Sequence, residues 1–126
     1  MPETKLEAVK KQFSKAVKQL GRVLEEEKNE IVRDSAIKRF EFTFDLSWKL
    51  LKAYLDEEKG IYCASPKECF RQAFQSGIVD YNEVWIEMTD QRNYAVHIYE
   101  EKFADELFKK LPKYLECFQE LQKIFN

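Results

Sequence analysis

The chain has 126 residues, of which 44% are hydrophobic and 14% aromatic, enough for one packed core despite 35% charged residues. Only three glycines and three prolines are present, which argues against a turn-rich sandwich or barrel. The 21 basic and 23 acidic residues give a net charge of −2, which argues against indiscriminate coating of nucleic acid. We therefore expect a single domain over residues 1–126.

Compartment and cysteine chemistry are constrained by what the sequence lacks. No apolar run approaches the roughly 20 residues that cross a bilayer, and the opening MPETKLEAVKK has no apolar core for a signal peptide. The cysteines Cys63, Cys69 and Cys117 are odd in number and have no CxxC spacing. This argues against a disulfide framework or a zinc site, and we expect all three as small buried apolar residues. We predict a cytoplasmic protein with no membrane association and no cofactor.

Two long helices are predicted in the first half of the chain. Residues 5–27 carry apolar side chains at three- and four-residue spacing, which indicates one buried stripe. Residues 34–58 carry two neighbouring stripes: Ile37, Phe40, Phe44, Trp48, Leu51 and Leu55, and then Phe42, Leu46, Leu50 and Tyr54. A helix that is apolar over so much of its circumference is expected at the centre of a bundle or against a partner chain.

Glycine and capping signals delimit the next elements. Gly60 is expected to end the second helix. The sequence Ser65-Pro66-Lys67-Glu68 combines a capping box with proline at the first helical position, so a short third helix begins there and ends at Gly77. Asp80 with Glu83 repeats the capping-box pattern and predicts the start of a fourth helix.

A fifth helix is predicted over residues 101–125. Its inward side chains are Phe103, Leu107, Leu111, Leu115, Phe118, Leu121 and Phe125. Pro112 lies inside this helix and is expected to kink or break it. The predicted fold is all-α: an antiparallel four-helix up-and-down bundle with an additional short helix, about five helices in all. We expect the second and fourth helices at its centre, with Trp48 and Trp85 largely buried.

The charged residues favour no metal site. A di-iron bundle requires Glu-x-x-His pairs, whereas Tyr94 stands three residues before His97, the only histidine. Four cations share one face of the first helix, either as a solvated surface or as a track for RNA phosphates: Lys11, Lys15, Lys18 and Arg22. Three acidic residues share a face of the fourth helix, expected to be solvated: Glu83, Glu87 and Asp90.

The segment from Asp90 to Tyr99 contains the best candidates for chemistry. Arg92 stands five residues before His97, and Asn93 stands four residues before it, on the same side of a continuous helix. Arginine can hold a phosphate in bidentate fashion, and histidine can exchange a proton near neutral pH. The alternative is a hydrogen-bonded structural histidine, because an Arg-x4-His spacing alone also arises by chance.

The chain resembles the HEPN superfamily, and within it the small nucleotidyltransferase substrate-binding proteins. Four stretches carry the resemblance: Phe40-Glu41-x-x-Phe44-x-Leu46-x-Trp48-Lys49-x-Leu51-Lys52, then Ser65-Pro66-Lys67, then Gly77 with Ile78 and Asp80, then Trp85-x-x-Met88-x-x-x-Arg92-Asn93-x-x-x-His97-x-Tyr99. The last stretch fits the Arg-x4-His-x-Tyr signature of that family at every defined position.

The resemblance implies a helical bundle that forms a homodimer and pools its Arg and His motifs at the interface. It implies a metal-independent endoribonuclease that acts as the toxin of a toxin–antitoxin pair. The implied partner is a minimal nucleotidyltransferase, the antitoxin, which can transfer AMP onto the motif tyrosine, here Tyr99. The older description of the family implies instead a non-catalytic subunit that presents substrate or nucleotide to a separate transferase.

On the first hypothesis, His97 is the general base for a ribose 2′-hydroxyl, Arg92 stabilises the phosphorane and Asn93 orients the phosphate. On the second, the same pocket binds substrate without cleaving it. On a continuous helix Tyr99 would lie about 20° from Arg92, since seven residues make nearly two turns. We expect its phenol beside the guanidinium, the alternative being an ordinary interface or core tyrosine.

Overall fold

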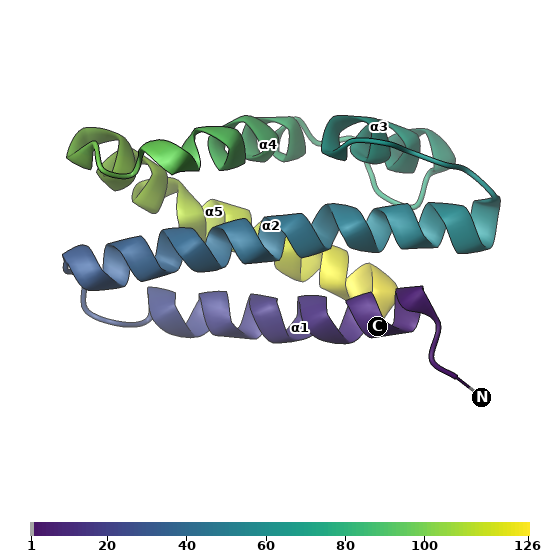
Figure 1. Ribbon diagram of the computed structural model, residues 1–126, viewed down its shortest axis with the longest axis horizontal. Helices are drawn as coiled ribbons and strands as arrows, with labels where there is room; N and C mark the ends of the chain where they lie inside the picture. Colours follow the sequence, from purple (N-terminus) through teal and green to yellow (C-terminus); the bar gives the residue numbers. More distant parts are fainter. Residues whose placement is uncertain (1) are drawn as a thin grey trace.

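The computed structural model describes residues 2–126, which form five α-helices, a 3₁₀ turn and no strand (Figure 1). The elements are α1 (Lys5–Leu24), α2 (Glu30–Lys59), α3 (Pro66–Ser76), α4 (Val84–Tyr94), the 3₁₀ turn η1 (Ala95–His97) and α5 (Glu101–Phe125). None of these helices is both long enough and apolar enough to span a membrane. The all-α prediction and the helix count are confirmed.

Helix α2 lies at the centre of the bundle and contacts all four other α-helices. Figure 1 shows α1 antiparallel to α2, α3 and α4 following one another along the opposite side of α2, and α5 crossing behind it. The two short helices together therefore occupy one position of a four-helix arrangement. The predicted central place of the second helix is confirmed, whereas α4 packs along one side of α2, between α3 and α5.

Aromatic rings from all five helices meet in the core. Phe40 of α2 stacks on Tyr114 of α5 with ring centroids 5.4 Å apart. Phe70 of α3 stacks on Trp85 of α4 at 4.9 Å. Further ring contacts join these pairs to each other and to α1: Phe44–Phe70, Trp85–Phe118 and Phe13–Phe118. Such pairs stabilise the fold by more than their buried apolar area accounts for, so this network fixes the relative positions of the helices.

Capping residues set where α2 begins and ends and where α3 begins. Asn29 accepts a hydrogen bond from the Val32 amide at 2.9 Å, so α2 begins at Glu30 rather than near residue 34. Ser65 accepts from the Glu68 amide at 3.3 Å, as the capping box predicts. Gly60 ends α2 with φ of 65°, a left-handed conformation that glycine adopts without strain.

The fourth helix begins later than its predicted capping box. Asp80 makes no cap; instead the Asn82 carboxamide oxygen accepts from the Val84 amide at 3.0 Å. Glu83 is the residue before α4 and its side chain forms no capping bond. The prediction was wrong because a capping box specifies residue types, and Asn82 offers the same acceptor nearer to the first buried residue, Trp85.

Pro112 does not break α5, which is continuous from Glu101 to Phe125. Proline lacks an amide hydrogen, so the Phe108 carbonyl four residues earlier loses its helical donor. Pro112 lies on the exposed side of the helix, where water can supply that donor. Leu111 and Tyr114 on either side of it are fully buried, and their packing holds the two halves of the helix together.

The expectation for the cysteines was partly wrong. All three are buried, as predicted, but Cys63 and Cys69 form a disulfide, with their Cα atoms 5.2 Å apart. The first turn of α3 brings Cys69 back against the loop after α2, a proximity that spacing in the sequence does not reveal. Cys117 is a free, buried thiol, and burial raises its pKa.

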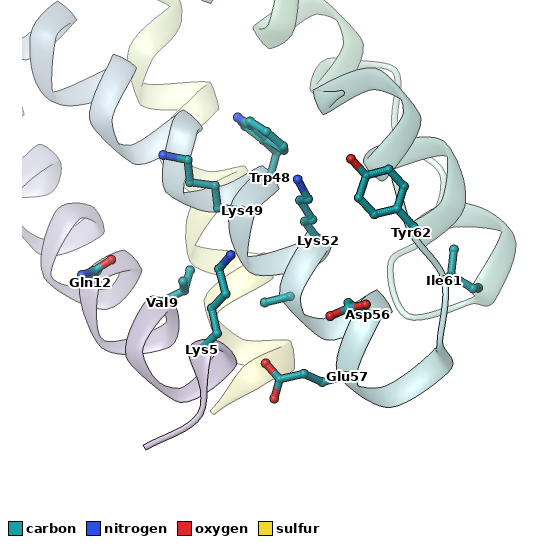
Figure 2. A pocket seen from close by; sticks show the side chains of 11 residues that line it. Lys5, Val9, Gln12, Trp48, Lys49, Lys52, Asp56, Glu57, Ile61 and Tyr62 are labelled. Carbon is teal, nitrogen blue, oxygen red and sulfur yellow. The ribbon is translucent and has the colours of Figure 1, made fainter. Parts of the chain in front are cut away.

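The two tryptophans differ in burial. Trp85 is 3% exposed, as expected for a core residue. Trp48 is only half-buried, contrary to expectation, because it lines a cavity between α1, α2 and the loop that follows α2 (Figure 2). Its apolar spacing in α2 was correct, but α1 does not cover this end of the stripe completely.

Two isoleucines in α2 test how far the core controls stability. Ile37 is fully buried, whereas Ile31 is 81% exposed on the same helix. We expect Ile37→Ala to lower the free energy of unfolding by about 2–5 kcal/mol, because it leaves a cavity. The matched variant Ile31→Ala should change it by less than about 0.5 kcal/mol. Chemical denaturation followed by circular dichroism measures both, and equal losses would contradict the packing described above.

Candidate functional site

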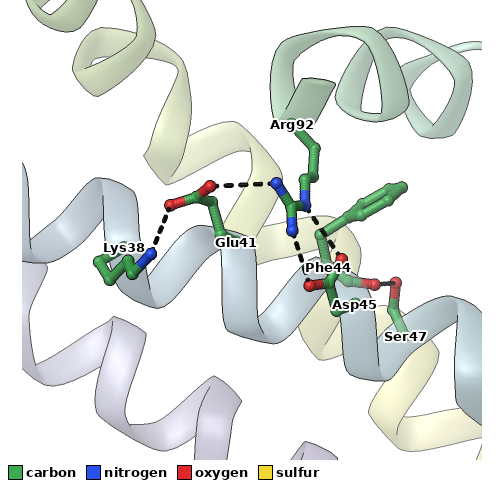
Figure 3. A network of polar contacts seen from close by, with 6 residues as sticks. All are labelled: Lys38, Glu41, Phe44, Asp45, Ser47 and Arg92. Atoms are coloured by element: carbon green, nitrogen blue, oxygen red, sulfur yellow. Dashed lines mark hydrogen bonds and ion pairs between the residues drawn. The ribbon is translucent and has the colours of Figure 1, made fainter. Parts of the chain in front are cut away.

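Arg92, in the last turn of α4, is held by two carboxylates of α2 (Figure 3). Its Nε and Nη2 atoms donate to the two oxygens of Asp45, each at 3.0 Å. Its Nη1 atom donates to Glu41 at 3.1 Å. Asp45 and Glu41 are four residues apart, so they project from the same side of α2 toward α4. The arginine therefore bridges two successive turns of the central helix.

The carboxylates fix both the charge and the orientation of the guanidinium. Hydrogen bonding to Asp45, assisted by the charges of Asp45 and Glu41, raises the pKa of Arg92. Glu41 also lies 3.7 Å from the ammonium of Lys38. Three of the five N–H donors of Arg92 are used, and its side chain is 29% exposed. The other two N–H donors have no hydrogen-bond partner within residues 2–126.

His97 and Tyr99 form an exposed pair just beyond α4. The Nδ1 atom of His97 lies 3.0 Å from the Tyr99 hydroxyl, and the rings meet edge to face with centroids 5.7 Å apart. Within residues 2–126, no hydrogen bond engages the Nε2 atom of His97. The imidazole thus has one nitrogen on a phenol and the other available to a ligand.

The segment between Arg92 and Tyr99 is not a continuous helix, which corrects the expected position of Tyr99. Helix α4 ends at Tyr94, and the 3₁₀ turn η1 follows. Ala95 is buried and Ile98 packs against the core, so the chain bends to insert both before α5 begins. The Tyr99 hydroxyl consequently contacts His97, whereas the hydrogen bonds of Arg92 are directed to α2.

The four motif residues therefore do not form one cluster. Arg92 is anchored inside the bundle, and His97 with Tyr99 lies on its surface. Asn93 is exposed, and its side chain makes no hydrogen bond within the described part of the chain. Over residues 2–126, neither a hydrogen bond nor an ion pair joins Arg92 to His97.

Part of the acidic face of α4 is engaged rather than simply solvated. Glu87 accepts a hydrogen bond from the buried Tyr114 hydroxyl, which lowers the pKa of Glu87, and it pairs with Lys113 at 3.3 Å. Asp90 pairs with Lys67 of α3 at 2.9 Å. No group of His, Cys, Asp and Glu side chains suited to a metal ion occurs in residues 2–126.

The row of cations on α1 lies on the surface. Lys15, Lys18 and Arg22 are exposed, and Lys11 is exposed and paired with Glu3.

The sequence did not identify Glu41 and Asp45 as partners of Arg92. One signal was available: Glu41 and Asp45 stand four residues apart among the apolar residues from Phe40 to Leu46, and carboxylates in such a position require a cation or solvent.

A double-mutant cycle measures how strongly α2 holds Arg92. Because Glu41 is nearly buried, we expect Arg92→Ala and Glu41→Ala to be coupled by about 0.5–3 kcal/mol in the free energy of unfolding. The exposed pair Lys67–Asp90, which also joins two helices, is the control and should couple by less than about 1 kcal/mol. Equal coupling in both pairs would show that Arg92 is not clamped.

Comparison with known proteins assigns the chain to a family. Residues 8–126 match the family described as nucleotidyltransferase substrate binding protein like. A probable ribonuclease HepT of Haemophilus influenzae is 28% identical over 93 residues, 68% of this chain; the match spans 64% of that relative's length. A crystal structure of a protein from Thermus thermophilus is 37% identical, covering 86% of this chain and 94% of that one, with a TM-score of 0.81. The chain therefore belongs to the nucleotidyltransferase substrate-binding protein family and is a homologue of probable ribonuclease HepT.

Proposed function

We propose that this protein is a metal-independent endoribonuclease of the HEPN type, the toxin of a pair whose antitoxin is a minimal nucleotidyltransferase. The observation that carries the proposal is the exposed imidazole of His97, whose Nε2 atom has no hydrogen-bond partner within residues 2–126, five residues after the anchored Arg92. The homology to a probable ribonuclease supports the same assignment.

In the proposed reaction, His97 Nε2 accepts the proton of a ribose 2′-hydroxyl. The 2′-oxygen then attacks the adjacent phosphorus and forms a 2′,3′-cyclic phosphate, while the bond to the 5′-oxygen breaks and that oxygen takes a proton from water. For Nε2 to act as the base, the proton of the neutral imidazole is on Nδ1, which then donates a hydrogen bond to the Tyr99 oxygen 3.0 Å away. The remaining N–H groups of Arg92 stabilise the phosphorane, and Asn93 orients the phosphate.

We propose that the active species is a homodimer. Tyr94, Val96 and Tyr99 all expose more than half of their surface on the segment that carries the motif. Exposed apolar residues gathered near one segment are typical of an interface. A symmetric contact through this segment would bring two copies of the Arg-x4-His motif together, so that Arg92 and His97 of different protomers can act on one phosphate.

Cleavage of RNA in the presence of EDTA tests the ribonuclease. We expect the wild-type homodimer to cleave RNA without metal, and His97→Ala to lower the rate by about 10²–10⁴-fold, the usual loss for a general base. Lys109→Gln, an exposed change on α5, should leave the rate unchanged. Denaturing gel electrophoresis measures cleavage, and light scattering measures the mass of the active species. Intact RNA after incubation with the wild-type protein would refute the nuclease.

One observation favours a second function, that of a non-catalytic subunit that presents substrate or nucleotide to the transferase. The two carboxylates that hold Arg92 neutralise much of its charge. This suits a side chain that donates hydrogen bonds to a bound substrate better than one that stabilises negative charge developing on a phosphate. Retained binding to the transferase together with intact RNA would support this function.

We further propose that the transferase adds AMP to Tyr99. The phenolic oxygen would attack the α-phosphorus of ATP, pyrophosphate would leave, and the phenolic proton would pass to a base of the transferase. Tyr99 is 73% exposed and so is open to another enzyme. Because its oxygen lies 3.0 Å from His97 Nδ1, the new phosphodiester would stand directly against the imidazole and obstruct substrate there.

Two tyrosines of the same segment, Tyr99 and Tyr94, test whether the modification is specific to one position. After incubation with the cognate transferase and ATP, mass spectrometry should find one AMP on Tyr99 and none on Tyr99→Phe. Tyr94 is also exposed, so Tyr94→Phe is the control, and this variant should be modified on Tyr99 like the wild type. We expect Tyr99→Phe to stay folded and active, since water can replace the phenol beside an exposed imidazole. An adduct elsewhere would contradict the assignment.

A further inference from the structure

The α2–α3 loop (residues 60–65) contains Cys63, whose disulfide to Cys69 lies outside the main core. Both cysteines are fully buried, and together with Leu55 they form a small apolar cluster of their own. The disulfide joins residues only six positions apart. A bridge of this length restricts the unfolded chain less than one that closes a longer loop, so we expect its effect to be mainly local.

Cys69 is held in place by bonds other than the disulfide. Its amide donates to the Ser65 carbonyl at 2.9 Å. The Ser65 hydroxyl accepts from the Glu68 amide at 3.3 Å, and the Glu68 carboxylate accepts from the Ala64 amide at 3.0 Å. Phe70, the next residue, is fully buried in the main core. Helix α3 therefore keeps Cys69 in position whether or not the sulfur–sulfur bond is present.

Cys63 has no comparable support. The Ile61 amide donates to the Leu55 carbonyl at 2.9 Å, and the next backbone bond along the chain is that of Ala64. In the described residues 2–126, no hydrogen bond engages the backbone of Tyr62 or Cys63. Tyr62 and Ala64, on either side of Cys63, are exposed. A local opening of two residues is therefore enough to bring a reductant to the buried sulfur.

The α2–α3 loop also forms one wall of the cavity that Trp48 lines (Figure 2). Ile61 and Tyr62 contribute this wall. The Lys52 ammonium lies between two rings, 5.3 Å from the centre of Tyr62 and 5.8 Å from that of Trp48. Release of residues 62–63 would therefore move the Tyr62 ring away from Lys52 and open the cavity on that side.

We propose that Cys63 and Cys69 are a reversible redox pair, and that their reduction by a dithiol releases the α2–α3 loop while the bundle stays folded. A thiolate of the dithiol attacks Cys63 Sγ, the disulfide bond breaks, and Cys69 leaves as a thiolate that takes up a proton. The second thiol of the dithiol then attacks the mixed disulfide and passes its proton to the released Cys63. The protein gains two electrons and two protons, and the dithiol becomes a disulfide. Reoxidation is rapid because α3 fixes Cys69 and because Cys63 lies between two anchored residues, Ile61 and Ala64.

Limited proteolysis with chymotrypsin tests the proposal on the full chain. Tyr62 and Tyr81 are matched sites, since they are 70% and 68% exposed and lie in the loops before and after α3. The folded protein is reduced with dithiothreitol, which is then removed without air. We expect cleavage after Tyr62 to become about tenfold faster, because the released loop can enter the protease. Cleavage after Tyr81 and the helical circular dichroism should not change, and oxidised glutathione should restore the slow cleavage.

Variants assign the response to this pair of cysteines. Cys63→Ser/Cys69→Ser should be cleaved after Tyr62 at the fast rate with or without dithiothreitol, whereas Cys117→Ser should respond like the wild type, because Cys117 is a free thiol. The His97→Ala variant should also respond like the wild type, so the result is independent of the proposed nuclease. Equal cleavage after Tyr62 in the oxidised and reduced wild type would overturn the proposal. Faster cleavage at both tyrosines would also overturn it, as would failure of dithiothreitol to reduce the folded protein.

Discussion

The aromatic core constrains every other feature of this protein. Phe40 and Phe44 lie on the one helix that contacts all the others, and their rings connect to partners from α3 and α5. Through Phe118 the same network reaches α1 and α4. Because rings of this size tolerate little displacement in a close-packed interior, the direction of α4 over α2 is fixed. That direction determines which residues of α2 face Arg92.

Polar groups at the helix interfaces then give the bundle its specific register. Arg92 joins α4 to α2, and Arg33, only 6% exposed, joins α2 to Asp105 of α5 at 3.2 Å. The Tyr114 hydroxyl joins α5 to Glu87 of α4. Groups of this kind are expensive to bury unpaired, so an alternative packing that separated them would be disfavoured even if it buried the same apolar area.

The end of α4 separates an anchored guanidinium from an exposed imidazole. Arg92 lies within the helix, where its orientation is fixed by two carboxylates, whereas His97 follows the bend and lies on the surface with Tyr99. A preorganised cation requires no rearrangement when charge develops on a phosphate. A surface histidine beside a tyrosine is accessible to a second protein. This division is compatible with a nuclease that a partner enzyme controls.

Apolar periodicity, glycine termini and capping pairs act over a few residues, so the all-α fold, most helix limits and the residues of the motif could be predicted from the sequence alone. The sequence did not predict that Glu41 and Asp45 hold Arg92, or that Cys63 bonds Cys69. It also placed Tyr99 beside Arg92, whereas the bend after Tyr94 places it beside His97. These facts depend on contacts between helices and on the burial of Ala95 and Ile98, which are set by how the whole bundle packs and not by local spacing.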